Sequence, residues 1–276
     1  MRRSLLAACC LFMACLYSAA QPTWGFRGGV GVDKKISKGM SAGLEARYHQ
    51  TDDFQRTDRW SLGVSLSKRL YRNEAKTFSV KSAVGYKFMK VYNDWSTKYK
   101  GDPAIAVNND LDPQYYIDNN YDFNLNNSYV ETRHRVTASV QAAAEFGRFK
   151  ISLRESYQFT HRDSADFVKD KYRYEDNSWT VKSSPDGKSP SNSNVLRSKV
   201  NMDYDIPHWK LDPFVSYEMF NGIDDSFKIE KSRITAGVEF SINKKHNFEV
   251  AYLWQNQHDD DEPAGSFICF DYTFEF

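Results

Sequence analysis

Charged residues recur inside stretches where apolar and polar residues alternate, and these are the residues that could carry chemistry. Alternate residues of a strand point to opposite sides, so the charges would share one face of a sheet. Enclosed in a barrel, they could form a polar pathway that selects small solutes, or a salt-bridged network that fills the interior and keeps it rigid. We favour the filled interior, and the sequence leaves both open. These candidate lumen residues are Glu45, Arg47, Arg59, Arg133, Arg135, Arg154, Arg197, Lys199, Asp203, Glu218, Arg233, Glu239 and Glu249.

Two histidines form a second candidate site. A hairpin turning at Gly147-Arg148 would place His134 directly opposite His161, on the outer face near the loop end. The pair could bind a metal or a lipopolysaccharide phosphate, or form an aromatic contact at the membrane interface. Zinc sites use three or four protein ligands. We therefore predict no metal and no other cofactor, with His134 and His161 as the one candidate pair.

An outer-membrane lipid hydrolase is the enzyme to consider, since such enzymes carry Ser and His on a barrel's outer face. The site would need a serine, a histidine and an acid converging near one rim. His134 and Glu155 lie about six residues apart along neighbouring strands, or roughly 20 Å. The chain has no Gly-x-Ser-x-Gly, His-Glu-x-x-His or phosphate-loop pattern. We predict that the protein is not an enzyme and has no catalytic residues.

Glu155 departs from the alternation. Its position in the sequence places it with Leu153 and Tyr157 on the apolar face, about midway along a strand. An acid facing hydrocarbon costs on the order of a few kcal/mol. We predict a β-bulge that turns Glu155 inward. If it faces outward instead, it marks a lipid or partner contact.

The elements that must position these residues are strands. Alternation is continuous over 40–48, 136–146 and 234–242, among other runs. A soluble β-sandwich also alternates. Fully charged residues in the middle of a strand are compatible with a water-filled lumen. The alternating runs are about 10 residues long, which matches a tilted membrane strand better than the mean strand length of about 5–6 residues in soluble proteins. We predict an all-β fold over residues 21–276, a transmembrane antiparallel up-and-down β-barrel.

The last run ends on aromatic residues. It resembles the signal by which the barrel-assembly machinery of Gram-negative bacteria recognises its clients, so this machinery is the expected partner during biogenesis. The signal residues are Phe270, Tyr272, Phe274 and Phe276.

Connection lengths predict the orientation. Short connections cover 146–149, 207–213 and 243–247, and longer loops cover 93–128, 162–194, 221–228 and 258–265. Outer-membrane barrels keep short turns in the periplasm and long loops outside. The runs number eleven, whereas bacterial single-chain barrels have even counts. Either a strand lies within 93–128 or the run at Trp24 is not a barrel strand, and we predict 10–12 strands.

The first 20 residues have the pattern of a cleaved signal peptide. Arg2 and Arg3 precede an uncharged stretch, and Ser18-Ala19-Ala20 supplies the small residues of a cleavage site. Lipoprotein processing at Cys9 is the alternative, but only five residues separate Cys9 from Arg3. After cleavage near Ala20, no intramolecular disulfide is available, because one cysteine remains.

Composition excludes several classes of protein. Lys and Arg number 37 and Asp and Glu 36, so no strong field favours nucleic acid. The mean hydropathy of −0.66 excludes a multi-span helical protein. Tyr 17, Phe 19 and Trp 6 are many aromatics for so polar a chain. A sheet with one apolar and one wet face accommodates them.

Short motifs recur along the chain from Trp24 onward, at 29–35, 57–64, 133–136, 147–150, 153–155, 196–198, 217–220 and 233–237. By these motifs the chain resembles a Bacteroidota outer-membrane barrel family known as domain of unknown function 2490. The resemblance implies the fold and an outer-membrane location, and it brings no agreed activity or catalytic residues.

We therefore expect an integral outer-membrane protein that is non-enzymatic and either passes small polar solutes or serves structurally. Its expected surroundings are outer-membrane lipid and lipopolysaccharide, and the sequence does not set its oligomeric state. The alternative is a closed barrel that binds a ligand or partner through loops 93–128 and 162–194. A lipid hydrolase is the third reading.

Overall fold

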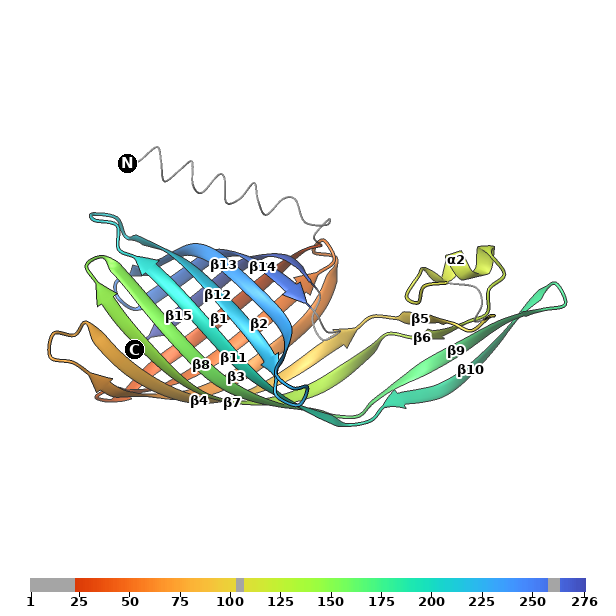
Figure 1. The fold of residues 1–276 in the computed structure, drawn as a ribbon, viewed down its shortest axis with the longest axis horizontal. Coiled ribbons are helices and arrows are strands. Elements are labelled where there is room, and N and C mark those ends of the chain that lie inside the picture. The colour runs from red at the N-terminus through yellow and green to blue at the C-terminus, as the bar shows by residue number, and fades with distance from the viewer. Residues whose placement is uncertain (1–22, 103–106, 258–263) are drawn as a thin grey trace.

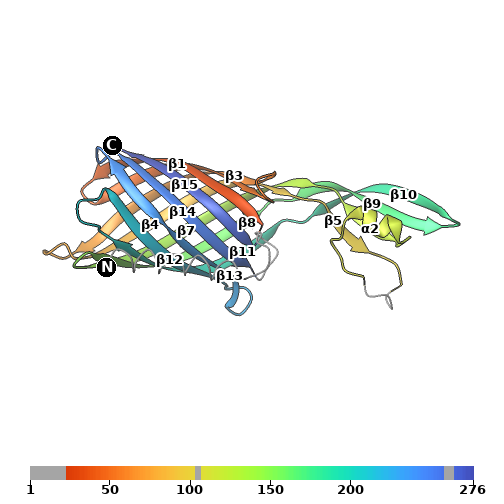
Figure 2. The same ribbon diagram turned by 90° about the horizontal axis from the view of Figure 1, so that it is seen from above.

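The computed structural model describes residues 23–102, 107–257 and 264–276, in which eleven strands form a closed barrel (Figures 1 and 2). The predicted signal peptide lies outside these residues, as does most of the predicted loop 258–265. The count agrees with the predicted 10–12 strands. The barrel strands are β1 Trp24–Ser37, β2 Met40–Thr51, β3 Arg56–Arg72, β4 Phe78–Asn93, β7 Tyr129–Phe146, β8 Phe149–Arg162, β11 Ser191–Tyr204, β12 Leu211–Gly222, β13 Lys228–Ile242, β14 His246–Gln257 and β15 Gly265–Glu275.

The barrel closes through a parallel pair. β1 runs alongside β15 in the same direction, with Trp24 opposite Ser266, while every other neighbouring pair is antiparallel. An odd number of up-and-down strands makes this unavoidable, because the first and last strands then point the same way. The expectation of an even count is therefore wrong. Strands do occur within 93–128, but they lie outside the barrel, and the run at Trp24 is a barrel strand.

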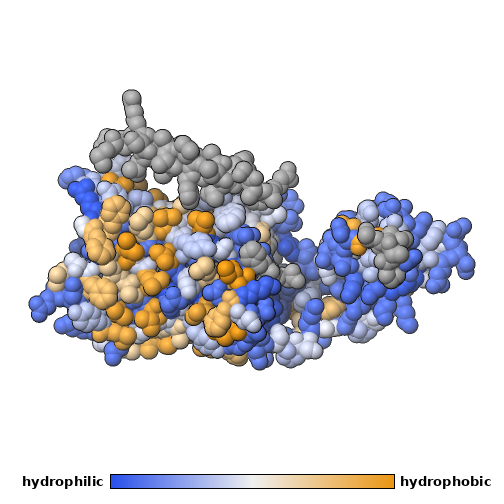
Figure 3. All heavy atoms as spheres, viewed as in Figure 1, coloured by the Kyte–Doolittle hydropathy of each residue, from blue (hydrophilic) through white to orange (hydrophobic). Residues whose placement is uncertain are grey.

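Alternation in the sequence becomes an apolar outside and a polar inside. Leu44 on β2 and Val64 on β3 are directly paired, and each is at least half exposed on the outer wall. Their neighbour Glu45 points inward opposite Gly63. Hydrophobic side chains consequently gather over the barrel wall in the space-filling view (Figure 3).

The two segments predicted as long loops fold into a second sheet, here called the blade, and this corrects the expectation of loops. Its strand order is β10-β9-β6-β5, and it projects beyond one end of the barrel (Figure 1). We call that end the loop end, and the opposite end, with the short connections, the turn end. The blade consists of β5 Ser96–Tyr99, the short helix α2 Pro113–Asp118, β6 Phe123–Asn126, β9 Ala165–Glu175 and β10 Ser178–Lys188.

An aromatic stack holds the blade together. Phe123 is fully buried, and its ring stacks on Tyr172 of β9 at 4.5 Å and on Tyr116 of α2 at 4.9 Å. The Thr97 hydroxyl on β5 donates to the carbonyl of Leu111 at 2.7 Å. The segment carrying α2 therefore covers one face of the blade. None of the helices in the described part of the chain is long and apolar enough to cross a membrane.

Candidate functional site: the barrel interior

Glu218 lies at the centre of the main charge cluster inside the barrel. Its carboxylate accepts two hydrogen bonds from Arg197, at 2.5 and 2.9 Å, and it is 5% exposed. Arg154 and Arg233 each approach it to 3.8 Å. The register explains the cluster, because Arg154, Lys199, Glu218 and Arg233 stand side by side on β8, β11, β12 and β13. One carboxylate thus balances several cations from neighbouring strands.

A second network joins strands near the closure of the barrel. Glu45 on β2 accepts from Arg47 at 3.1 Å and from Lys87 of β4 at 2.6 Å. Arg47 also approaches Asp271 of β15, at 3.4 Å. Gly29 of β1 lies between Arg47 and Asp271 in the register, and a Cβ there would stand 2.0 Å from the Asp271 carboxylate. The glycine leaves the space through which this ion pair forms.

Three further predicted arginines have partners close by. Arg59 pairs with Asp58 at 2.7 Å and Arg133 with Glu131 at 2.8 Å, and both arginines are almost fully buried. Arg135 donates to the Thr160 hydroxyl at 3.1 Å. These contacts fix long cationic side chains in place near the loop end.

Sequence reasoning missed several interior residues that join these networks. Gln255 of β14 is 1% exposed, and its side-chain carbonyl accepts from Arg27 at 3.1 Å and from Arg233 at 2.6 Å. The Phe220 ring lies beneath Arg197 and Arg233, 5.1 and 4.6 Å from their guanidinium carbons. Strand parity alone identifies these positions as inward-facing. Gln255 and Phe220 were not predicted because only charged residues in the middle of strands were considered as candidates.

The interior at the loop end is packed around its whole circumference. Every barrel strand contributes at least one inward side chain with less than a tenth of its surface exposed, and we call this set the loop-side layer. Its members are Arg27, Thr51, Arg59, Met89, Arg133, Thr160, Val195, Phe220, Lys231, Gln255 and Phe267.

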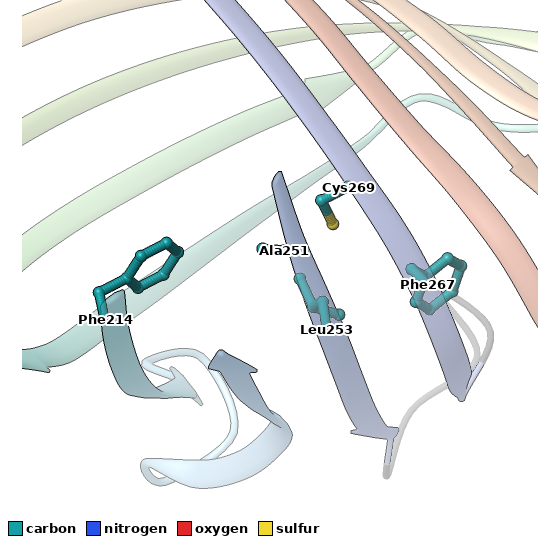
Figure 4. Close-up of a cluster of buried hydrophobic side chains, with 5 residues drawn as sticks. All are labelled: Phe214, Ala251, Leu253, Phe267 and Cys269. Atoms are coloured by element: carbon teal, nitrogen blue, oxygen red, sulfur yellow. The ribbon is translucent and has the colours of Figure 1, made fainter. Parts of the chain in front are cut away.

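An apolar cluster extends the loop-side layer along one side of the interior. Phe267 packs with Phe214, Ala251, Leu253 and Cys269, all buried, on β12, β14 and β15 (Figure 4). These buried side chains lie next to the loop-side layer, so the interior is packed more closely here than at the turn end, where a cavity lies.

The turn end of the interior is open and acidic. Asp212, Glu239, Glu249 and Asp271 stand directly opposite one another on four successive strands, β12 to β15. They line a cavity of about 340 Å³. Asp203, nearby on β11, is 3.5 Å from Lys150. Like charges placed opposite each other in a sheet destabilise it, and within this row Asp271 alone has an ion pair described above, with Arg47 at 3.4 Å.

Glu155 faces outward, and the predicted β-bulge is wrong. The register runs without a shift through Val140 on one side and Ser198 on the other. The Ser198 hydroxyl donates to the Glu155 carboxylate at 2.7 Å. A hydrogen-bond donor on the neighbouring strand, rather than a change in backbone, offsets part of the cost of the outward acid.

The two histidines lie opposite each other, at the predicted register. The Asp163 carboxylate lies between them, 3.4 Å from each Nε2, and the Tyr86 hydroxyl is 2.7 Å from Nδ1 of His134. Within the described ranges, no group of three His, Cys, Asp or Glu side chains is arranged to hold a metal. His134 and His161 thus belong to a hydrogen-bonded patch at the rim.

The C-terminal aromatics lie along β15. Phe270, Tyr272 and Phe274 belong to the outward set of that strand, and the Phe276 carbonyl accepts from the Lys35 amide of β1 at 3.1 Å. Recognition of these residues by the assembly machinery stays a prediction.

Comparisons with known proteins give a family and a distant structural likeness. A family model described as "Protein of unknown function (DUF2490)" matches residues 28–264. No curated protein matches the chain. Among solved structures, the chain is similar to the translocator domain of the autotransporter NalP from Neisseria meningitidis, with a TM-score of 0.40 and 10% identity. The match covers 81% of this chain and 70% of that one.

Proposed function

The chain belongs to the DUF2490 family, and we propose that it is a non-enzymatic outer-membrane β-barrel whose sealed interior makes it a rigid base for the blade. The outer wall supports a membrane location. Val30, Leu44, Leu62 and Val136 are among many apolar side chains more than half exposed there. An apolar surface this extensive is a liability in water. A closed barrel, with no unpaired strand edge, is the one sheet arrangement that a bilayer accepts.

The orientation follows from the connections. Outer-membrane barrels place short turns in the periplasm and long connections outside. The blade grows from the long connections at the loop end, so it would stand outside the cell. Its surface is predominantly hydrophilic, in contrast to the barrel wall (Figure 3).

The packed loop-side layer is the observation that carries the proposal. Ions cross a barrel only through a continuous column of water, and the buried ring at the loop end interrupts that column. The interior charges then serve as internal cross-links: Glu218 joins three strands through arginines, and Glu45 joins β2 to β4. The packed layer and these cross-links together favour a closed barrel with binding segments at 93–128 and 162–194 over a barrel that passes small solutes.

The test is single-channel recording of the refolded mature protein in a planar bilayer. We expect no conductance steps from protein that is shown to be folded by a heat-dependent gel shift. Discrete steps proportional to salt concentration would contradict the sealed interior and return the function to solute passage. A mature protein that stays soluble without detergent would contradict the membrane location itself.

A further inference from the structure

The uncovered face of the blade carries a row of lysines. Lys98 on β5, Lys171 on β9 and Lys182 on β10 share one line across the sheet, with Asn124 of β6 between the first two. Directly paired residues project to the same side of a sheet. The row crosses three strand spacings, or about 14 Å.

Among the described residues, these three lysines have no acidic partner. Two other bases on the same face do have one: Lys169 pairs with Asp186, and Arg173 lies 3.7 Å from Asp122. Across the described parts of the chain, no carboxylate forms an ion pair with the lysine row. Lys171 and Lys182 also stand directly opposite each other, and like charges in that position destabilise a sheet. A bound anion would relieve the repulsion.

The rest of this face can form hydrogen bonds but offers little apolar surface. Ser96, Asn126 and Ser184 occupy the line next to the lysine row. The single aromatic ring among the paired positions of this face, Phe167, stacks on Tyr129 at 5.2 Å. The main aromatic stack lies on the opposite face, under α2. Around the lysine row the exposed groups are mainly ammonium, amide and hydroxyl groups, and the carboxylates of Asp186 and Glu175 lie toward the two ends of the face.

We propose that this face binds an acidic polysaccharide, with the lysine row on the carboxylates and the amides and hydroxyls on the sugar hydroxyl groups. This inference rests on the proposed function, in which the sealed barrel holds the blade outside the cell. Binding of single-stranded nucleic acid depends on free aromatic rings for base stacking. A protein partner needs aromatic or arginine anchors in pockets, and insertion into lipid needs an apolar face. Among the described residues of this face, the one ring, Phe167, is stacked on Tyr129, and the one arginine, Arg173, is held by Asp122 and by the Phe123 carbonyl.

The test measures binding of polygalacturonate to the mature protein in lipid nanodiscs, with neutral dextran, polyglutamate and duplex DNA as comparison polymers. We expect salt-sensitive binding of polygalacturonate and none of dextran. A K98Q/K171Q/K182Q variant should bind about tenfold more weakly or worse, from three lost charge contacts. The matched control K38Q/K76Q/K244Q removes the same charge from exposed turns at the opposite end of the barrel, and it should bind as the unmodified protein does.

Several outcomes would overturn the proposal. These are absence of polygalacturonate binding, equal losses in the two triple variants, and polyglutamate or DNA binding as tight as polygalacturonate. Chymotrypsin resistance at Phe123 and Tyr172 verifies that the blade stays folded in each variant, because both rings lie in the aromatic stack. The bilayer recording is independent of this assay. A barrel that shows no conductance and does not bind polygalacturonate refutes only the proposed ligand. A barrel that conducts ions refutes only the sealed interior.

Discussion

Neutralising Glu218 should weaken the barrel more than any other single carboxylate change inside it. Glu218 is buried, accepts two hydrogen bonds from Arg197, and lies within 3.8 Å of Arg154 and Arg233. Removing one partner of a buried ion pair costs about 3–5 kcal/mol, because the other charge is left uncompensated. The E218Q substitution keeps the side-chain shape and one acceptor oxygen. We therefore expect a loss of about 3 kcal/mol.

The measurement is the free energy of unfolding in urea, followed by tryptophan fluorescence, for barrels refolded into lipid vesicles. The matched control is E239Q, the same chemical change one strand away. Glu239 faces the acidic cavity, directly opposite Asp212 and Glu249, so losing its charge relieves repulsion and should leave stability unchanged or slightly higher. If the two glutamine variants unfold within about 0.5 kcal/mol of each other, the charge cluster around Glu218 does not hold the barrel together.

Three other changes have expected outcomes. G25A should destabilise the barrel by about 1–3 kcal/mol in the same urea titration. The new Cβ would lie 2.6 Å from the Phe267 ring and 2.4 Å from the Gln50 backbone carbonyl. An unchanged unfolding midpoint would mean that the ring has room to move. E155L should stabilise the barrel in vesicles by about 1–2 kcal/mol by removing an outward charge, and a destabilised variant would show that its bond to Ser198 outweighs that charge. F123A should expose the blade to chymotrypsin while the heat-dependent gel shift of the barrel persists, and loss of both together would show that blade and barrel fold as one unit.

Rules that relate residues close together in the sequence were sufficient to predict the barrel strands and the side to which their residues point. The tight turn at Gly147 fixes the register of β7 and β8, since hairpin register follows from turn geometry, and His134 and His161 consequently lie opposite each other. Parity along each run likewise assigns inward and outward positions. These relations depend on residues close together in sequence, which is why they could be predicted without the fold.

Relations between distant segments could not be predicted in this way. β5 and β6 are four residues each and mostly polar. They become strands because they pair with each other and because β6 also pairs with β9, more than 40 residues later. Glu155 obeys parity, yet its partner Ser198 lies 43 positions away in the sequence. The cost of an outward acid, considered without that partner, led to the prediction of a bulge. Gln255 likewise acquires its interior role only when β1 and β13 bring Arg27 and Arg233 to it.

The odd strand count bears on the sealed interior that we propose. With eleven strands, β1 must run parallel to β15, so the first residues of β1 lie at the loop end beside the first residues of β15. Gly25 there stands opposite Phe267, and Arg27 lies 4.0 Å over the Phe267 ring while its guanidinium bonds Gln255. An antiparallel closure would carry the start of β1 to the turn end, among the carboxylates of the acidic cavity. The loop-side layer would then lack Arg27, and the Phe267 ring and the Gln255 carbonyl would each lose a partner. The parallel closure thus places the Arg27 guanidinium in the loop-side layer, beside the Phe267 ring and the Gln255 side chain.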